Sequence, residues 1–144
     1  MSDLNERFSA ALHNSSRAWR QALDRRLRYL GVSQASWMTI ALAAKAREPL
    51  SQSELADRLG VEPATMVAMV DRLMKAGLVT RVPSPTDRRV KRVVLTAPGN
   101  DLYERLTAEA ATFRQQLLLG LPRDRLLTAT EVLESLQGLI DALP

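Results

Sequence analysis

The fold of this chain is decided by residues 55–79, which read LADRLGVEPATMVAMVDRLMKAGLV. Two helical patterns, at residues 52–59 and 63–76, are joined here by a short turn that contains Gly60. A pair of helices joined by a short glycine-containing turn is typical of a helix-turn-helix motif. In such a motif the second helix enters the major groove of DNA, whose width fits one α-helix.

Local signals mark the ends of these two helices. Ser51 followed three residues later by Glu54 predicts a capping box, although Ser53 is an alternative cap. Pro63 suits an early helical position, where its missing N–H leaves no hydrogen bond unmade. Gly77 ends the second helix.

The hydrophobic pattern changes from helical to period two after Gly77. Residues 78–82 and 90–95 are expected to be strands, joined by a tip at residues 83–89 that is rich in Pro, Asp and Arg. A basic hairpin that follows a helix-turn-helix predicts a wing, whose arginines can reach a minor groove or the phosphates.

Long helical patterns flank this block on both sides. They lie at residues 3–30, 37–46, about 98–119 and 121–143, with Ser33 as the cap and Pro49 as the end of the second. The expected order is α-α-α-α-β-β-α-α, a mostly α (α+β) chain. We expect one domain over residues 1–144, with a winged helix-turn-helix core at about 33–97 and long N- and C-terminal dimerisation helices at about 3–30 and 98–143.

The terminal helices carry apolar faces that are too long for a small winged-helix core to cover. Residues 126–143 and 4–12 are therefore expected to pair with the same helices of a second chain. The alternative is that these helices fold back on their own core.

Composition excludes several classes of protein. The chain of 144 residues has no cysteine and a single histidine, His13, which argues against thiolate metal sites, disulfides and histidine-based catalysis. We expect no cofactor, no metal site and no enzymatic activity. No apolar run reaches the length of a membrane span and the N-terminus is polar, so we expect a cytoplasmic protein. The formal net charge of +4 includes two basic segments, which indicate a polyanionic partner or simply solvated faces.

The chain resembles the MarR family of transcriptional regulators over about residues 8–140. The resemblance rests on residues 55–79, on Asp87-Arg88-Arg89 at the hairpin tip, and on VLTAPG at residues 94–99. The segments RAWR at residues 17–20 and LGVSQASW at residues 30–37 are similar to the SlyA branch. The resemblance implies a sequence-specific, DNA-binding transcriptional regulator that acts as a homodimeric repressor on a pseudo-palindromic operator. The alternative is a winged-helix module whose wing binds a protein.

The resemblance also implies roles for the wing. Arg89 would insert into the minor groove, and Asp87 would hold its guanidinium through paired hydrogen bonds. Arg88, Lys91 and Arg92 would contact phosphates or raise the local potential.

Helical spacing puts several residues on the outward side of the second helix. These are Glu62, Ala64, Thr65, Ala68, Met69 and Arg72. An arginine is common in the SlyA branch where this chain has Ala68, so DNA shape and the wing are expected to carry much of the specificity. Arg72 either contacts DNA or pairs with Asp71 or another acid. Except for Glu62, these residues join Ser51, Ser53 and the basic wing residues in the predicted DNA-binding set.

A small aromatic carboxylate is the expected effector. Arg17 and Arg20 flank Trp19 on the first helix, and Trp37 lies on the second, so cationic groups and an apolar wall would share a crevice. Regulators of the MarR family often respond to such acids. The alternative is that both tryptophans are core residues and the arginines are solvated.

Overall fold

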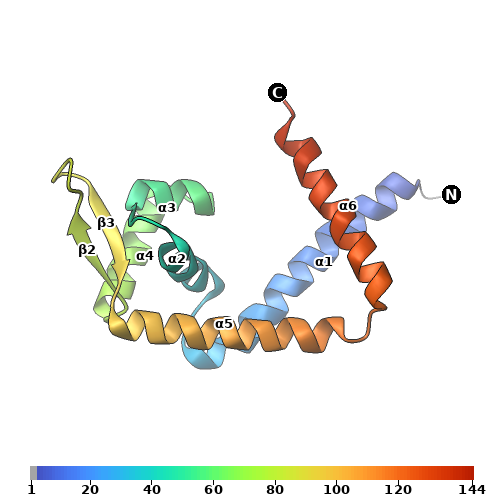
Figure 1. Ribbon diagram of the computed structural model, residues 1–144, viewed down its shortest axis with the longest axis horizontal. Helices are drawn as coiled ribbons and strands as arrows, with labels where there is room; N and C mark the ends of the chain where they lie inside the picture. Colours follow the sequence, from blue (N-terminus) through green and yellow to red (C-terminus); the bar gives the residue numbers. More distant parts are fainter. Residues whose placement is uncertain (1–2) are drawn as a thin grey trace. The chain divides into compact units, whose positions relative to one another are not determined.

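The computed structural model describes residues 3–144, which divide into two units, one ending at Ala110 and the other comprising Ala111–Pro144 (Figure 1). The expected mostly helical α+β fold with a winged helix-turn-helix is confirmed. The elements are α1 (Leu4–Leu27), the 3₁₀ turn η1 (Arg28–Leu30), α2 (Gln34–Lys45), β1 (Leu50–Ser51), α3 (Gln52–Leu59), α4 (Pro63–Lys75), β2 (Val79–Pro83), β3 (Lys91–Leu95), α5 (Ala97–Leu118) and α6 (Arg123–Asp141).

The sheet is antiparallel and has three strands in the order β1-β3-β2. The expected hairpin is confirmed, with Val79 of β2 opposite Leu95 of β3. Strand β1 was not expected from the sequence. It has only two residues, too few for a period-two pattern, and it is a strand because Leu50 pairs with Val93 of β3.

The core of the first unit lies between α2, α3, α4 and the sheet. Its members are Ile40, Leu50, Leu55, Ala56, Met66, Met69, Val70, Leu73, Val79 and Val93. Burying one such side chain contributes roughly 1.5–3 kcal/mol. The four core residues that α4 supplies therefore determine which side of this helix faces outward.

Side chains near the chain's turns set several helix ends. The hydroxyl of Ser33 accepts a hydrogen bond from the backbone N–H of Ser36, and the expected capping box of Ser51 and Glu54 is formed. Helix α2 ends at Lys45, earlier than expected, because Ala46 already has an extended backbone (ψ 133°). The residues that follow lead into β1, whose pairing requires an extended chain.

The second unit exposes most of its apolar side chains. Within the single chain α6 has no buried residue, and Leu139 is 69% exposed. The N-terminal half of α1 similarly exposes Leu4, Phe8 and Leu12. Among the described residues, no helix is both long enough and apolar enough to cross a membrane.

Candidate nucleic-acid interface

The turn between α3 and α4 is closed by local hydrogen bonds. Gly60 ends α3 in the left-handed region at φ 72°, and its N–H donates to the carbonyls of Ala56 and Asp57. Val61 N–H also donates to the carbonyl of Ala56. Residues with a side chain rarely adopt this backbone conformation, so a glycine at position 60 allows the chain to turn here. Helix α4 then begins at Pro63.

Helix α4 presents small and polar side chains to solvent. Ala64, Thr65, Ala68 and Arg72 are exposed, as the helical spacing predicted, and so is Glu62, which precedes the helix. Small residues on an exposed helix face leave room for close approach to a groove, and their methyl groups suit contact with thymine methyls.

The expectation that Met69 faces outward is wrong. Met69 is 6% exposed, and its sulfur accepts a hydrogen bond from the hydroxyl of Ser36 at 3.2 Å. Residue 69 lies three positions after Met66 and four before Leu73, both of which are buried, so it shares their face of the helix. Met69 therefore packs α4 against α2 and leaves the predicted set of DNA contacts.

Val67 and Met74 are both exposed on one flank of α4. Arg81 of β2 lies over this flank. It donates to the sulfur of Met74 (3.1 Å) and to the carbonyl of Val67 (3.4 Å). It also forms an ion pair with Asp71 at 2.7 Å. The expected alternative of an Arg72–Asp71 pair is wrong: Asp71 pairs with Arg81, and Nη2 of Arg72 lies 3.7 Å from the sulfur of Met69.

The wing tip holds Arg89 in a defined position. Its Nε and Nη2 lie 3.2 and 3.4 Å from the two carboxylate oxygens of Asp87, and its backbone N–H donates to Asp87 Oδ1 at 3.0 Å. The expected Asp87–Arg89 contact is thus confirmed. The Arg89 side chain, followed by its backbone N–H, lowers the pKa of Asp87 below its ordinary value, so the carboxylate stays ionised near neutral pH. The Arg89 side chain is nevertheless 92% exposed.

The other wing residues differ in exposure. Arg88 and Lys91 are exposed, whereas Arg92 is half-buried. Sequence reasoning missed Ser84, which is buried at the base of the tip. Its N–H donates to the carbonyl of Val90, and its hydroxyl lies 3.2 Å from that of Thr86. Ser84 therefore closes the loop that carries Arg89, a role that only its Ser-Pro-Thr-Asp setting hints at.

The two serines at the start of α3 have different surroundings. Ser53 is exposed and stays in the predicted DNA-binding set. Ser51 is buried, and its hydroxyl accepts the backbone N–H of Glu54 at 3.1 Å. The prediction of a DNA contact by Ser51 is therefore corrected, because the capping box uses its side chain.

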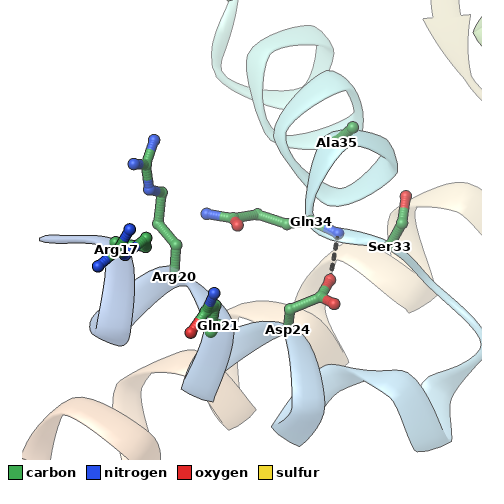
Figure 2. A pocket seen from close by; sticks show the side chains of 7 residues that line it. All are labelled: Arg17, Arg20, Gln21, Asp24, Ser33, Gln34 and Ala35. Atoms are coloured by element: carbon green, nitrogen blue, oxygen red, sulfur yellow. Dashed lines mark hydrogen bonds between the residues drawn. The ribbon is translucent and has the colours of Figure 1, made fainter. Parts of the chain in front are cut away.

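A hollow of about 440 Å³ brings Arg17 and Arg20 of α1 beside the start of α2 (Figure 2). Its lining residues are Arg17, Arg20, Gln21, Asp24, Ser33, Gln34 and Ala35. Asp24 Oδ1 accepts the backbone N–H of Gln34 at 3.0 Å, so this carboxylate is turned toward the helix start. Within residues 3–144, no group of three or more His, Asp or Glu residues is arranged to hold a metal ion.

The expected aromatic wall is not part of this hollow. Trp19 and Trp37 are half-buried, and neither is among its lining residues. The indole Nε1 of Trp37 is buried and has no hydrogen-bond partner in the described part of the chain. The expectation that these tryptophans share a crevice with Arg17 and Arg20 is therefore wrong for this hollow, because helical spacing places Trp19 on a different side of α1 from both arginines.

Comparison with known proteins places the whole chain among transcriptional regulators. A family model described as the MarR family matches residues 32–91. The chain is 37% identical to the solved transcriptional regulator PA3341, with a TM-score of 0.81, over 94% of this chain and 99% of that one. It is 25% identical to CouR from Rhodococcus jostii RHA1, solved bound to p-coumaroyl-CoA, with a TM-score of 0.78 over 94% and 95% of the two chains. Wild-type MarR from E. coli shares the fold at 24% identity, with a TM-score of 0.80 over 94% and 98%.

Proposed function

This chain belongs to the MarR family of DNA-binding transcriptional regulators, and we propose that it is a homodimeric repressor of a pseudo-palindromic operator. Membership of the family implies DNA binding and dimerisation. A repressor works where its operator lies, so we place it in the cytoplasm. The observation that carries the proposal is the exposed Arg89, held by Asp87 on the hairpin that directly follows the recognition helix α4.

Within the family, we place the chain in the SlyA-like branch. The support is the RAWR segment at residues 17–20 and the LGVSQASW segment at residues 30–37. The branch assignment stays a proposal, and it matters because Ala68 replaces the arginine that is common there. A chain without that arginine must obtain its specificity from other contacts.

The recognition helix would read DNA with few hydrogen bonds. Ala64 and Ala68 offer methyl groups for thymine, and Thr65 offers a hydroxyl for a base or a phosphate. Arg72 is exposed, with its Nη2 3.7 Å from the sulfur of Met69, and would extend toward the DNA backbone. Direct readout by this helix is therefore limited, and sites rich in A·T pairs would suit it.

The wing would supply the remaining specificity. Arg89 would enter a minor groove, whose negative potential is greatest where A·T-rich sequence makes the groove narrow. Arg88, Lys91 and Arg92 would contact phosphates, and Ser53 would do the same from the start of α3. In a dimer the two recognition helices would then meet major grooves about 34–36 Å apart.

Selection of genomic DNA fragments with the purified protein tests this function. Bound fragments should share a pseudo-palindrome, and affinity for them should fall steeply as salt is raised, with a log–log slope of about −0.9 for each phosphate contact. The matched control is R89A, which should enrich the same fragments less strongly. Enrichment of no fragment by the native protein, or an affinity independent of salt, would favour a protein-binding wing and overturn the proposal.

We further propose that a small aromatic carboxylate lowers operator affinity by binding beside Arg17 and Arg20. Two guanidinium groups on one face of α1 suit a carboxylate, and the hollow between them and α2 has room for one ring. The relative CouR was solved bound to p-coumaroyl-CoA, which supports an aromatic ligand, although its aromatic acyl group is a thioester and not a free carboxylate. Coupling requires that the ligand prefer a dimer whose recognition helices are badly spaced for DNA.

Titration with salicylate tests the effector site. Millimolar salicylate should change tryptophan fluorescence, because Trp19 neighbours Arg20 in α1, and it should lower operator affinity. R17A and R20A should weaken both responses, whereas R125A on α6 serves as a control of equal charge. Unaltered fluorescence and DNA binding, or equal responses in all variants, would remove this site.

A further inference from the structure

Arg81 of β2 has every nitrogen of its guanidinium engaged within the first unit. Nε donates to Gln52 Oε1 at 2.6 Å, Nη1 to Met74 Sδ at 3.1 Å, and Nη2 to Asp71 at 2.7 Å and to the carbonyl of Val67 at 3.4 Å. The side chain is 22% exposed. One residue of the hairpin therefore joins the start of α3, the middle of α4 and the first strand of the wing.

The partner carboxylate lies on the outward side of α4. Residues 64, 68, 71 and 75 are spaced by four, three and four positions, which places them on one helix face. Ala64, Ala68, Asp71 and Lys75 are all exposed, and the Asp71 side chain is 54% exposed. A DNA-facing helix thus carries an acidic group at the centre of its outward face, where an unpaired negative charge would repel phosphates.

We propose that Arg81 is a positioning residue for DNA binding: it neutralises Asp71 and locks the wing strand to the recognition helix, and it contacts no phosphate. This inference rests on the proposed function, because it concerns the surface that would meet the operator. Arg81 differs in this respect from Arg88, Arg89 and Lys91, whose side chains are exposed at the wing tip. Although Arg81 belongs to the same basic segment, its charge is directed at α4.

The contacts explain why an arginine is needed at this position. Lysine offers a single charged nitrogen, whereas the planar guanidinium can donate to a carboxylate, an amide oxygen and a carbonyl at once. Together these contacts hold the rotation of α4 about its own axis relative to β2. They would keep Ala64, Thr65 and Ala68 in register with the wing arginine that binds the neighbouring groove.

Operator affinity measured over a series of salt concentrations tests the inference. R81Q should lower affinity about tenfold, the scale of a lost charge-assisted hydrogen bond. The slope of log affinity against log salt should change by much less than the roughly 0.9 that one phosphate contact contributes. R88Q provides the reference for such a contact, because Arg88 is exposed at the wing tip. R58Q on α3 controls for the loss of one positive charge.

A double-mutant cycle with D71N gives a second, independent readout. If Arg81 acts through Asp71, R81Q should cost about tenfold in the native background and less than threefold in the D71N background. R81K should restore part of the affinity with a native salt slope, and thermal unfolding of each variant verifies that it is folded. R81K also keeps the test decisive if R81Q does not fold.

Two results would overturn the inference while leaving the proposed function intact. One is a salt slope that falls in R81Q by as much as in R88Q, which would make Arg81 a phosphate contact. The other is an additive cycle, with equal losses in both backgrounds. Failure of the native protein to bind any selected fragment would instead overturn the proposed function and this inference together.

Discussion

At the wing tip, the contact between Arg89 and Asp87 positions a side chain for DNA binding. Arg89 extends into solvent, yet Asp87 limits the directions its guanidinium can take. An arginine held in this way loses less conformational freedom on binding than a free one. The Asp87–Arg89 pair therefore pre-orients an exposed guanidinium for insertion into a DNA minor groove.

We predict that R89A weakens operator binding by about 1–3 kcal/mol, because a specific arginine contact is lost. Its melting temperature should match that of the native protein, since the side chain is exposed and belongs to no core. D87N should reduce affinity less, because the arginine is retained but is held less firmly. Fluorescence anisotropy with the selected operator measures both, and equal affinity of R89A and native protein at every salt concentration would contradict the role.

Gly99 sits where α5 begins against the turn before β2. A Cβ added at this residue would lie 2.0 Å from the carbonyl oxygen of Leu78, which is backbone and cannot move aside easily. The same junction is closed by Thr96, whose hydroxyl donates to the carbonyl of Gly77 and accepts the N–H of Gly99. The close approach of Leu78 thus explains why a glycine occupies position 99.

We predict that G99A destabilises the protein by about 1–3 kcal/mol through this overlap. The matched control is G120A, where the added methyl group meets no atom within 4 Å. Urea unfolding followed by circular dichroism compares the two variants. Equal midpoints would show that the junction adjusts at no cost.

At the scale of elements, an ion pair ties α1 to α5. Arg26 Nε lies 2.5 Å from Glu109 Oε1, and both side chains are partly buried. The hydrogen bond from Arg26, followed by one from Tyr29, lowers the pKa of Glu109 below its ordinary value of 4.5. The hydrogen bond between Tyr29 and Glu109, followed by desolvation, raises the pKa of Tyr29 above its ordinary value of 10.0.

We predict that this cluster makes stability depend on pH at both extremes. The folded pKa of Glu109 is depressed, so its contribution is present above its ordinary pKa and is lost as pH falls through the folded value. The folded pKa of Tyr29 is raised, so its contribution is present below its ordinary pKa and is lost as pH rises through the folded value. The melting temperature of native protein should exceed that of E109Q between pH 6 and about 9, and the gap should narrow below pH 4.5 and above 10. A gap that stays constant from pH 3 to 7 would contradict the assignment to Glu109.

For the whole molecule, the decisive feature is the apolar surface on the terminal helices. Leu133, Leu139 and Ile140 of α6 are exposed in the single chain, as are Leu4 and Phe8 of α1. Exposed apolar patches of this kind mark association surfaces. A second copy of the chain is the partner that family membership implies.

We predict a dimer in the absence of DNA, with a mass about twice the 16.0 kDa of the chain. Deleting residues 130–144 should cause aggregation or unfolding, because it removes the apolar residues of α6 that would pair with the second chain. Sedimentation at micromolar concentration measures the mass. A stable monomer at that concentration, or a truncated chain that stays folded and binds the operator as well as the native one, would contradict this arrangement.

Most of the local structure follows from the sequence alone. The alternation of apolar residues, the capping residues and Gly60 set the helices and the hairpin through interactions between residues near in the chain. The Asp87–Arg89 contact belongs to the same class, since two positions separate its partners. For these features, the physics that decides the structure is contained in short stretches of chain.

Other features depend on residues that meet only in the folded chain. Strand β1 forms because its residues pair with the edge of β3. Met69 is buried because Ser36 and the core lie on that side of α4. The ion pair of Arg81 with Asp71 joins β2 to α4, and neither the hydrophobic periodicity nor a sequence motif predicts it. The hollow beside Arg17 likewise excludes both tryptophans, which sequence proximity had placed there. Tertiary packing decided these features, because burial and charge pairing between distant residues outweigh local pattern.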